Sequence, residues 1–452
     1  MPDKMFIDFS AISSKQWKQK IQYELSGEDY NETLVWESPE GIKVKPFYHR
    51  DEDVAGSLSA PRDEPFRICQ DIFVFDVAKS AVRALDTINR GAESIRFIIE
   101  DDTTDIELLL SNLQVDGLTL YFELGFLSSD YKSKIQQALQ GRNVQCFIDV
   151  DPIGRLAKDG NWFTSQPVDN FEVLEKNLHK LNSISVNGCL YHNAGANMAQ
   201  QLAYTLAHAT EYFNRFSNVK QPVLIKMSVG SNYFFEIAKL RAMRILFDAV
   251  ASEFGHTAGC HLYVTPGRRN KTLYDYNVNM LRTTSECMSA ILGGADAVAN
   301  LPYDALYHKS NEFAERIARN QLLILKHESY FDKVGNAADG SYYIESLTNQ
   351  LAEKALIIVK EIEAAGGFLE QLKSGVIQRK IAESAEKEQQ LFDSAKEILL
   401  GTNKQINKND RMQHELELFP FVKVKSKKTL VTPIIEKRLA EKVEQERLAL
   451  EK

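Results

Sequence analysis

The stretch "PVLIKMSVGSNYFFEIAKLRAMRILFDAVASEFG", residues 222–255, decides the fold class of this chain. Its first part, up to Gly230, is a short apolar run typical of a strand that is buried on both faces. In its second part, apolar residues recur at three- and four-residue spacing, which predicts a helix over 232–254. Asn232 is a favourable residue for the start of that helix, and Gly255 for its end. A buried strand followed directly by a helix is the unit from which parallel sheets are built.

The same alternation repeats through most of the chain. Strands are expected over 66–71, 94–101, 118–124, 144–151, 183–188, 222–230, 260–267 and 296–304. Helices are expected over 75–89, 105–113, 127–140, 169–181, 194–215, 232–254, 277–291 and 311–328. Because eight such units close a barrel, the sequence predicts an α/β fold of the (β/α)8 TIM-barrel type and not an open doubly wound sheet. Neither GxGxxG after the first strand nor GxxxxGK[ST] occurs, so the usual nucleotide-binding classes are not indicated.

The two ends of the chain differ in texture from this core. Residues 1–65 mix a short amphipathic piece with extended, charged segments, which predicts an N-terminal arm that contacts another subunit. Residues 66–340 form the predicted barrel, and residues 341–452 a C-terminal helical extension that begins with one long amphipathic helix. The tail "TPIIEKRLAEKVEQERLALEK", residues 432–452, predicts a charged helix that is solvated or faces a partner.

Composition places the chain among ordinary globular proteins of the cytoplasm. Its 452 residues carry a net charge of −8, which argues against nucleic acid or an anionic membrane as a partner. No apolar run approaches the roughly 20 residues that span a bilayer, and the N-terminus lacks the apolar core of a secretory signal. The five cysteines form no CxxC pair and are expected to be reduced, buried thiols.

Two chemical hypotheses follow from the residues at the predicted strand ends. Glu123, Asp149 and Asp151 could bind Mg²⁺ or Mn²⁺ in a metal-dependent lyase, although such carboxylates also cap helices and form ion pairs. His192, in "SVNGCLYHNAGANMAQ" (185–200), could act as a general acid, or it could be a hydrogen-bonded structural residue.

The loop "GRRNK", residues 267–271, presents a pair of arginines. Arg268 and Arg269 could bind a phosphate-bearing ligand, but a solvated basic loop is the expected state. Asn232 joins them as a weak candidate for substrate binding, and the sequence indicates no stronger one.

Several segments together resemble the methylmalonyl-CoA mutase family. Residues 193–207, 228–246, 272–296 and 316–348 are similar, in order, to barrel segments of that family, and "SGEDYNETLVWESPEGIKVKPFY" (26–48) is similar to its small-subunit branch. The resemblance implies a barrel with a CoA ester along its axis and adenosylcobalamin held at the barrel top by a separate domain. It also implies a radical rearrangement between methylmalonyl-CoA and succinyl-CoA, for which the cofactor supplies the chemistry.

The chain departs from the pattern that the active members of this family share. No histidine here lies in the Asp-x-His-x-x-Gly motif that ligates cobalt, and the chain is expected to end before such a domain. Matching Gly188 and the Ala-Gly-Ala run without gaps puts Cys189 at the family's tyrosine and Leu190 at its catalytic histidine. His192 comes two residues later, and in an extended segment it would face the same way as residue 190 but lie displaced by about 6–7 Å.

Two further positions of the family's site are altered. Asp71, in "ICQD", stands where the family has a second active-site tyrosine. An ionised, desolvated carboxylate would not replace that residue beside a radical pair. The arginine that binds the substrate carboxylate has only Arg155 as a weak counterpart.

These departures lead to the expectation of a small (beta) subunit without catalytic residues or metal ligands. The large (alpha) subunit would be its partner and would bind adenosylcobalamin and substrate. An obligate interface of this kind is large and apolar, so the chain alone is expected to self-associate or to dissolve poorly. Two alternatives stay open: the catalytic barrel chain of a split acyl-CoA mutase with a separate cobalamin subunit, and a metal-dependent TIM-barrel lyase.

Overall fold

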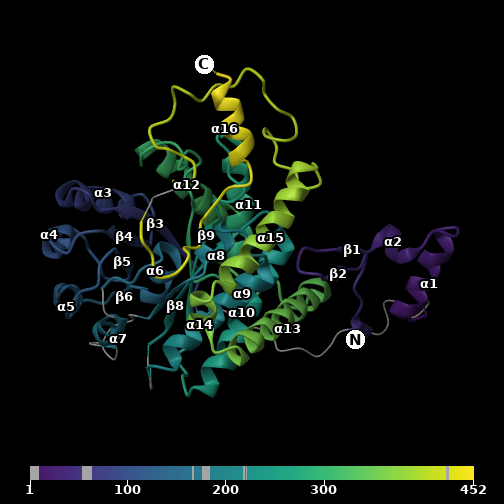
Figure 1. The fold of residues 1–452 in the computed structure, drawn as a ribbon, viewed down its shortest axis with the longest axis horizontal. Helices are drawn as coiled ribbons and strands as arrows, with labels where there is room; N and C mark the ends of the chain where they lie inside the picture. Colours follow the sequence, from purple (N-terminus) through teal and green to yellow (C-terminus); the bar gives the residue numbers. More distant parts are fainter. Residues whose placement is uncertain are drawn as a thin grey trace.

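Eight parallel strands form the centre of the molecule, in the order β6-β5-β4-β3-β10-β9-β8-β7 (Figure 1). The computed structural model describes residues 10–52, 64–164, 167–175, 184–216, 219, 221–423 and 427–451. The strands are β3 (Arg67–Phe73), β4 (Ser94–Ile99), β5 (Thr119–Leu124), β6 (Gln145–Asp149), β7 (Ser185–Asn187), β8 (Val223–Val229), β9 (Cys260–Pro266) and β10 (Ala297–Ala299). They lie where the sequence predicts strands.

The sheet is rolled into a nearly closed barrel. The last strand, β10, pairs with the first, β3, in parallel register. The described residues show no pairing between β6 and β7, but the two strand ends are joined by the backbone N–H of Asn187, which donates to Asp151 Oδ2 at 2.9 Å. The predicted TIM barrel is confirmed.

Alternation along β8 separates the barrel interior from the outer layer. Val223, Ile225, Met227 and Val229 belong to the large apolar core shared with the surrounding helices. Leu224 packs instead with side chains of other strands inside the barrel. Because successive side chains of a strand point to opposite faces, Lys226 also points inward.

Helices surround the barrel, with α3, α4 and α5 on one side and α9, α10 and α13 on the other (Figure 1). The helices of the barrel region are α3 (Val77–Asn89), α4 (Ile106–Leu110), α5 (Ser129–Ala138), α6 (Pro152–Asp159), α7 (Pro167–Glu175), α8 (Cys189–Asn193), α9 (Met198–Phe213), α10 (Tyr233–Glu253), α11 (Val278–Leu292) and α12 (Glu312–Leu323), the last continued by a π-helical turn (Ile324–Glu328). The helix expected over 169–181 appears as α7, and its part after residue 175 lies outside the described residues. The short helices α6 and α8 were not expected.

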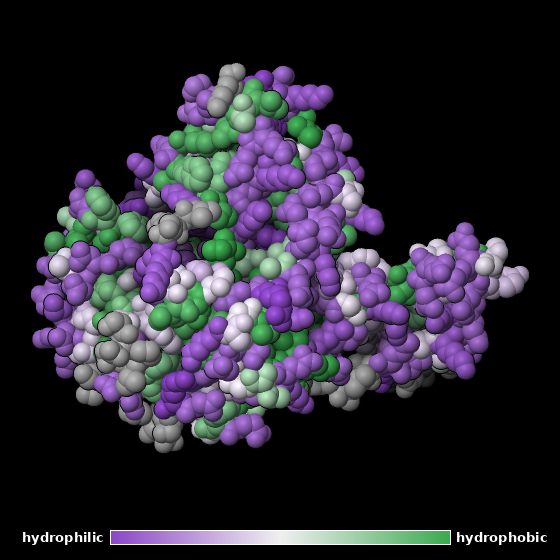
Figure 2. Space-filling model, viewed as in Figure 1, coloured by the Kyte–Doolittle hydropathy of each residue, from purple (hydrophilic) through white to green (hydrophobic). Residues whose placement is uncertain are grey.

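The N-terminal segment projects from the barrel as an arm (Figures 1 and 2). It contains α1 (Ser14–Glu24), α2 (Tyr30–Leu34), the two-stranded sheet β1 (Trp36–Glu37) and β2 (Lys43–Val44), and a 3-10 turn (Arg50–Glu52). The arm is attached by its β1–β2 part: the Trp36 ring contacts Phe235 of α10 with centroids 5.7 Å apart, and Ile42 is buried in the main core. Residues 1–9 and 53–63 of the predicted arm lie outside the described part of the chain.

The C-terminal region returns to the barrel. Its helices are α13 (Tyr342–Ala364), α14 (Phe368–Lys373), α15 (Val376–Asp393) and α16 (Glu441–Ala449). Residues 430–439, here called the strap, cross the end of the barrel where the strands finish. Backbone N–H groups of Ile434, Lys437 and Leu439 donate to the carbonyls of Ala157 in α6 (2.8 Å), Asn193 in α8 (3.1 Å) and Arg269 after β9 (2.9 Å).

The prediction of a charged tail helix holds for Glu441–Ala449, where most side chains are exposed or half-buried, and is wrong for the residues before it, which form the strap. Arg438 and Glu444 are 5% and 1% exposed and form an ion pair of 2.6 Å. Glu444 also accepts from the backbone of Leu273 at 2.7 Å. The charges of Arg438 and Glu444 are thus satisfied by each other and by backbone groups, which allows these two side chains to be buried.

No helix in the described ranges has both the length and the apolar character that crossing a membrane requires.

Candidate functional site

The interior of the barrel is filled with aromatic side chains near its N-terminal end. Tyr121, Phe147 and Tyr263 are at most 1% exposed and pack with Leu224. The Tyr121 and Phe147 rings stack with centroids 5.4 Å apart, and the Tyr121 hydroxyl is 2.7 Å from Nε2 of His261. Side-chain layers of this kind make the inside of a TIM barrel a packed core and not a pore.

Above this layer, towards the C-terminal ends of the strands, lies a layer of charged groups. Lys226 Nζ donates to Asp149 Oδ2 at 2.5 Å and to Glu123 Oε2 at 2.9 Å. Burial raises the pKa of Asp149 to about 6, against the effect of Lys226. Burial also opposes ionisation of Glu123, but Arg96 and Lys226 outweigh it and hold the pKa of Glu123 below its usual range.

Arg96 extends the charged layer to the first strand. Its guanidinium lies 3.0 Å from Glu123 Oε2 and 3.2 Å from Asp71 Oδ2. The hydroxyl of Tyr263 donates to the other oxygen of Asp71 at 2.5 Å. The sequence-predicted position Asp71 is thus part of an ionic layer contributed by strands β3 to β6 and β8.

The three carboxylates considered as metal ligands do not form one site. Glu123 and Asp149 are engaged by cations, whereas Asp151 begins α6 and accepts from Gly154 N at 2.8 Å and from the Tyr212 hydroxyl at 2.6 Å. Asp151 also lies 2.9 Å from His208 Nε2. Within the described ranges no group of three or more His, Cys, Asp and Glu side chains is arranged to hold a metal ion. Asp151 instead caps a helix, and Glu123 and Asp149 form ion pairs, which is the alternative that the sequence left open.

The loop after β7 is helical, which corrects the expectation of an extended segment at residues 189–193. These residues form α8. Leu190 is 1% exposed and packs in the main apolar core. Cys189 is half-buried, and burial raises the pKa of its thiol. Since residues two apart on a helix point to nearly opposite sides, His192 does not share the facing of Leu190.

His192 points towards the ends of β8 and β9. A Cβ atom at Gly267 would lie 2.6 Å from His192 Cδ2, and one at Gly230 would lie 3.3 Å from Cε1, so these glycines leave the space that the imidazole occupies. Burial, with the cations Lys239, Arg269 and Lys271, lowers the pKa of His192 well below its usual range. The imidazole is therefore neutral near pH 7, and it has no hydrogen-bond partner among the described residues.

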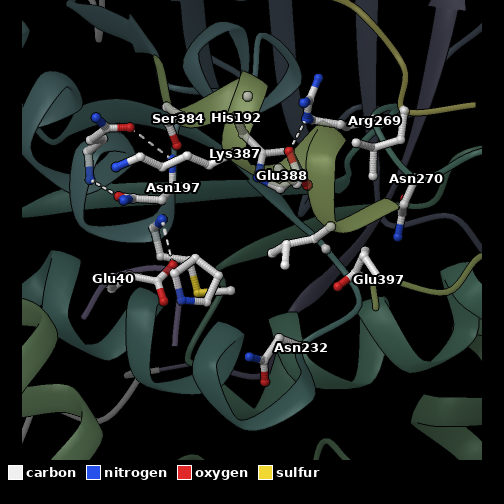
Figure 3. Close-up of a pocket in the computed structure, with 18 of the residues that line it drawn as sticks. Glu40, His192, Asn197, Asn232, Arg269, Asn270, Ser384, Lys387, Glu388 and Glu397 are labelled. Carbon is white, nitrogen blue, oxygen red and sulfur yellow. Dashed lines mark hydrogen bonds and ion pairs between the residues drawn. The ribbon is translucent and has the colours of Figure 1, made fainter. Parts of the chain in front are cut away.

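A cavity of about 740 Å³ opens beside His192 (Figure 3). Its walls come from the segments that follow β7, β8 and β9, from the start of α9, from the arm, from α15 with the residues after it, and from Leu439 of the strap. Asn232 lies at the start of α10, and Lys387 and Glu388 extend from α15 on the opposite side of the cavity (Figure 3). Trp36 brings an aromatic ring from the arm.

The structure separates the arginines named by the sequence. Arg269 lines the cavity but is 6% exposed, and its guanidinium binds Glu388 and the carbonyl of Lys437 in the strap. The expectation of a solvated basic loop is wrong for Arg269 because these partners neutralise it. Arg268 is exposed. Arg155 pairs with Asp159 of its own helix at 2.7 Å and is not among the residues that line the cavity.

Sequence reasoning missed the cations of the barrel interior and two walls of the cavity. Lys226 in "VLIKMSV" and Arg96 in "SIRFII" are single charges in otherwise apolar strands, a signal that could have indicated interior ion pairs. Trp36 and Lys387 reach the cavity only through tertiary contacts, and no local pattern indicates this.

Comparison with known proteins gives a consistent result. The family described as "Methylmalonyl-CoA mutase" matches residues 101–452. The chain is 33% identical to the methylmalonyl-CoA mutase small subunit of Porphyromonas gingivalis, covering 89% of this chain and 71% of that protein. It is 38% identical to a methylmalonyl-CoA mutase of Cereibacter sphaeroides, covering 86% of this chain and 64% of that protein. The small subunit of Streptomyces virginiae is 28% identical, over 83% of this chain and 67% of the relative.

The chain thus spans about two thirds of the length of these relatives. The family match covers well over half of the chain, and the Porphyromonas gingivalis relative aligns along almost all of it. On these grounds, the chain belongs to the methylmalonyl-CoA mutase family.

Proposed function

We propose that this chain is the small, non-catalytic subunit of a heterodimeric methylmalonyl-CoA mutase. In this proposal, a large subunit binds the acyl-CoA and adenosylcobalamin and catalyses the interconversion of methylmalonyl-CoA and succinyl-CoA. The names of two relatives, from Porphyromonas gingivalis and Streptomyces virginiae, support the assignment to the small-subunit branch.

The observation that carries the proposal is the filled barrel axis. A CoA ester along the axis, as the family resemblance implies, would have to displace the stacked rings of Tyr121 and Phe147. It would also have to separate Lys226 from Asp149 and Glu123, which would leave buried charges without partners. Both changes are costly, so this barrel is better suited to support a partner than to bind the substrate.

The described residues do not fit adenosylcobalamin either. When bound in an active subunit, this cofactor supplies the radical chemistry of the rearrangement. In this chain the strap crosses the C-terminal end of the barrel, hydrogen-bonded to Ala157, Asn193 and Arg269. Leu190, at the position matched to the family's histidine, is packed in the core. We therefore propose that the partner binds the cofactor.

The arm is the proposed contact with the large subunit. Its helices α1 and α2 project from the barrel (Figure 2). Trp17 and Tyr23 of α1 are 43% and 86% exposed, and Ile12 just before it is 54% exposed. Exposed aromatic and apolar groups on a projecting element are typical of a surface that a partner covers. We also propose that the chain divides into an arm (1–65), a barrel (66–340) and a C-terminal extension (341–452). We further propose that the protein is located in the cytoplasm.

The test combines the purified chain with adenosylcobalamin and methylmalonyl-CoA, alone and with a candidate large subunit. Succinyl-CoA formation and the corrin absorption spectrum are followed. We expect no turnover from the chain alone, and a stable one-to-one complex with turnover after the large subunit is added. Turnover with only a small cobalamin-binding chain would instead support the split-mutase alternative and overturn the proposal.

A further inference from the structure

A second hollow, here called the arm groove, lies between the arm and the start of α13. It has a volume of about 590 Å³ and is formed by residues 44–48 of the arm and residues 340–343 at the start of α13. Its two sides meet at Tyr48 and Tyr343, whose ring centroids are 5.0 Å apart. The arm therefore contacts the rest of the protein at two places, through Trp36 and through Tyr48 (Figure 1).

The lining of the arm groove is mostly apolar and aromatic: Val44, Pro46, Phe47, Tyr48, Tyr342 and Tyr343. The row of rings continues beyond both ends of the groove. Trp17 of α1 packs edge-on against Phe47 with centroids 6.3 Å apart, and Phe234 of α10 packs against Tyr343 at 5.5 Å. Trp17 and Phe234 are 43% and 48% exposed. A continuous row of partly exposed rings from separate elements is typical of a surface that a partner covers.

The polar side chains of the arm groove include hydrogen-bond donors but no carboxylate. Lys45 is the charged residue of the lining, and it pairs with Glu52 at 3.0 Å. The hydroxyls of Tyr342 and Tyr343 have no hydrogen bond to another described residue. Burial raises the pKa of Tyr343, so its hydroxyl stays protonated and able to donate. The groove thus presents rings and free hydroxyls to an occupant.

The chemistry of this lining favours one kind of occupant. A β-strand of ordinary sequence brings N–H groups that need acceptors, and a basic peptide needs carboxylates. A polyproline II segment has no internal hydrogen bonds, so its carbonyls are free to accept, and proline has no N–H. Grooves lined by aromatic rings are the usual recognition sites for such segments. The arm groove therefore matches an extended segment that contains proline.

We propose that the arm groove binds an extended, proline-containing segment of the large subunit. The identity of the occupant rests on the proposed function, in which the arm contacts that subunit. Trp17, part of the proposed contact surface, packs directly against Phe47 of the groove, so the two surfaces are continuous. Because one side of the groove belongs to the arm and the other to α13, the bound segment would hold the arm in place.

The first experiment uses a fluorescein-labelled decaproline peptide as the probe. Its fluorescence anisotropy is followed while the purified full chain is added. A labelled peptide of five Gly-Ser repeats, which has the same length but is flexible and lacks proline rings, is the control. We expect saturable binding of decaproline and at least tenfold weaker binding of the Gly-Ser peptide. No saturable binding, or equal binding of the two peptides, would overturn the proposal.

Matched variants locate the binding. Tyr342→Ala should weaken decaproline binding about tenfold, and Tyr342 is 37% exposed, so folding is not at risk. Tyr342→Phe keeps the ring and removes the hydroxyl donor, and it should weaken binding about threefold. Tyr23→Ala, at an exposed tyrosine of α1 outside the groove lining, should leave binding unchanged. Equal effects of Tyr342→Ala and Tyr23→Ala would overturn the proposal.

A competition experiment identifies the occupant. A candidate large subunit is added to the chain with labelled decaproline bound, and we expect the peptide to be released as the complex forms. A complex that leaves the peptide bound would overturn this inference while the proposed function stands. If no complex forms, the proposed function fails, and the assignment of the groove to the large subunit is overturned with it.

Discussion

Replacing Lys226 by methionine tests the charged layer inside the barrel. The lysine Nζ lies 2.5 Å from Asp149 and 2.9 Å from Glu123, and the Lys226 side chain is 7% exposed. Methionine keeps most of the side-chain volume but removes the charge. The substitution therefore leaves two carboxylates in the interior with Arg96 as their nearest cation.

The size of the effect follows from the burial of the pair. Removing one partner of a buried ion pair costs about 3–5 kcal/mol, because the remaining charge is left uncompensated. Asp149 is 3% exposed, so little solvent screens it. Without Lys226 the pKa of Asp149 should rise further, and the pKa of Glu123 should rise from its lowered position, so the folded variant takes up protons as the pH falls. A group with a raised folded-state pKa loses stability as the pH rises through that pKa, and the deficit of the variant should thus be largest above pH 7 and shrink towards pH 5.

Urea denaturation followed by tryptophan fluorescence at pH 5 and pH 8 measures this difference. Lys387→Met is the control, since it removes an exposed lysine and should change the free energy of unfolding by less than about 0.5 kcal/mol. A loss below about 1 kcal/mol for Lys226→Met at pH 8 would refute the reasoning, as would an equal loss at both pH values. Either result would mean that Lys226 does not hold ionised carboxylates in the barrel interior.

Three further substitutions test other parts of the structure. Asp149→Asn removes a group whose pKa is raised by burial, so the free energy of unfolding of the wild type, relative to the variant, should fall as the pH rises from about 4 to 7 in denaturation curves. Leu190→His introduces the residue type that the family resemblance implies at this position, and it should lower the free energy of unfolding by about 2–4 kcal/mol in the same assay because Leu190 is 1% exposed in an apolar site. This variant should show no turnover with adenosylcobalamin and methylmalonyl-CoA. Measurable turnover would contradict the placement of residue 190 in the core. Arg438→Ala should break the buried ion pair with Glu444 and raise the rate of backbone hydrogen exchange across residues 430–439. Lys442→Ala, at an exposed position of α16, should leave that rate unchanged. Equal exchange rates in both variants would show that the strap is held without this pair.

The barrel could be predicted from the sequence because its determinants are local. Strand segments such as 222–230 are apolar on both faces. In the helix that follows, apolar residues recur with helical spacing, and Asn232 and Gly255 predict its two ends to within two residues. Repetition of this unit eight times leaves few topologies open. The arm was also predictable, since residues 10–52 break the alternation and carry mixed, extended segments.

The site was less predictable, because its residues are assembled from distant segments. The ion pair of Asp71 with Arg96 could not be predicted from either segment, because it exists only where β3 and β4 lie side by side. The expected facing of His192 is wrong because it rests on an extended segment, whereas residues 189–193 form the helix α8. A segment of five residues has too little periodicity to distinguish the two states.

What the sequence by itself determined is the order of strands and helices and the family, both of which are properties of the local chain. The tertiary structure alone decided that Lys226, Asp149 and Glu123 fill the barrel axis and that part of the charged tail crosses the end of the barrel as the strap. The physical reason is that a charge can be buried only when a partner is brought to it, and the partners here lie 77 and 103 residues away from Lys226 along the chain. No pattern within one segment can show such a pairing.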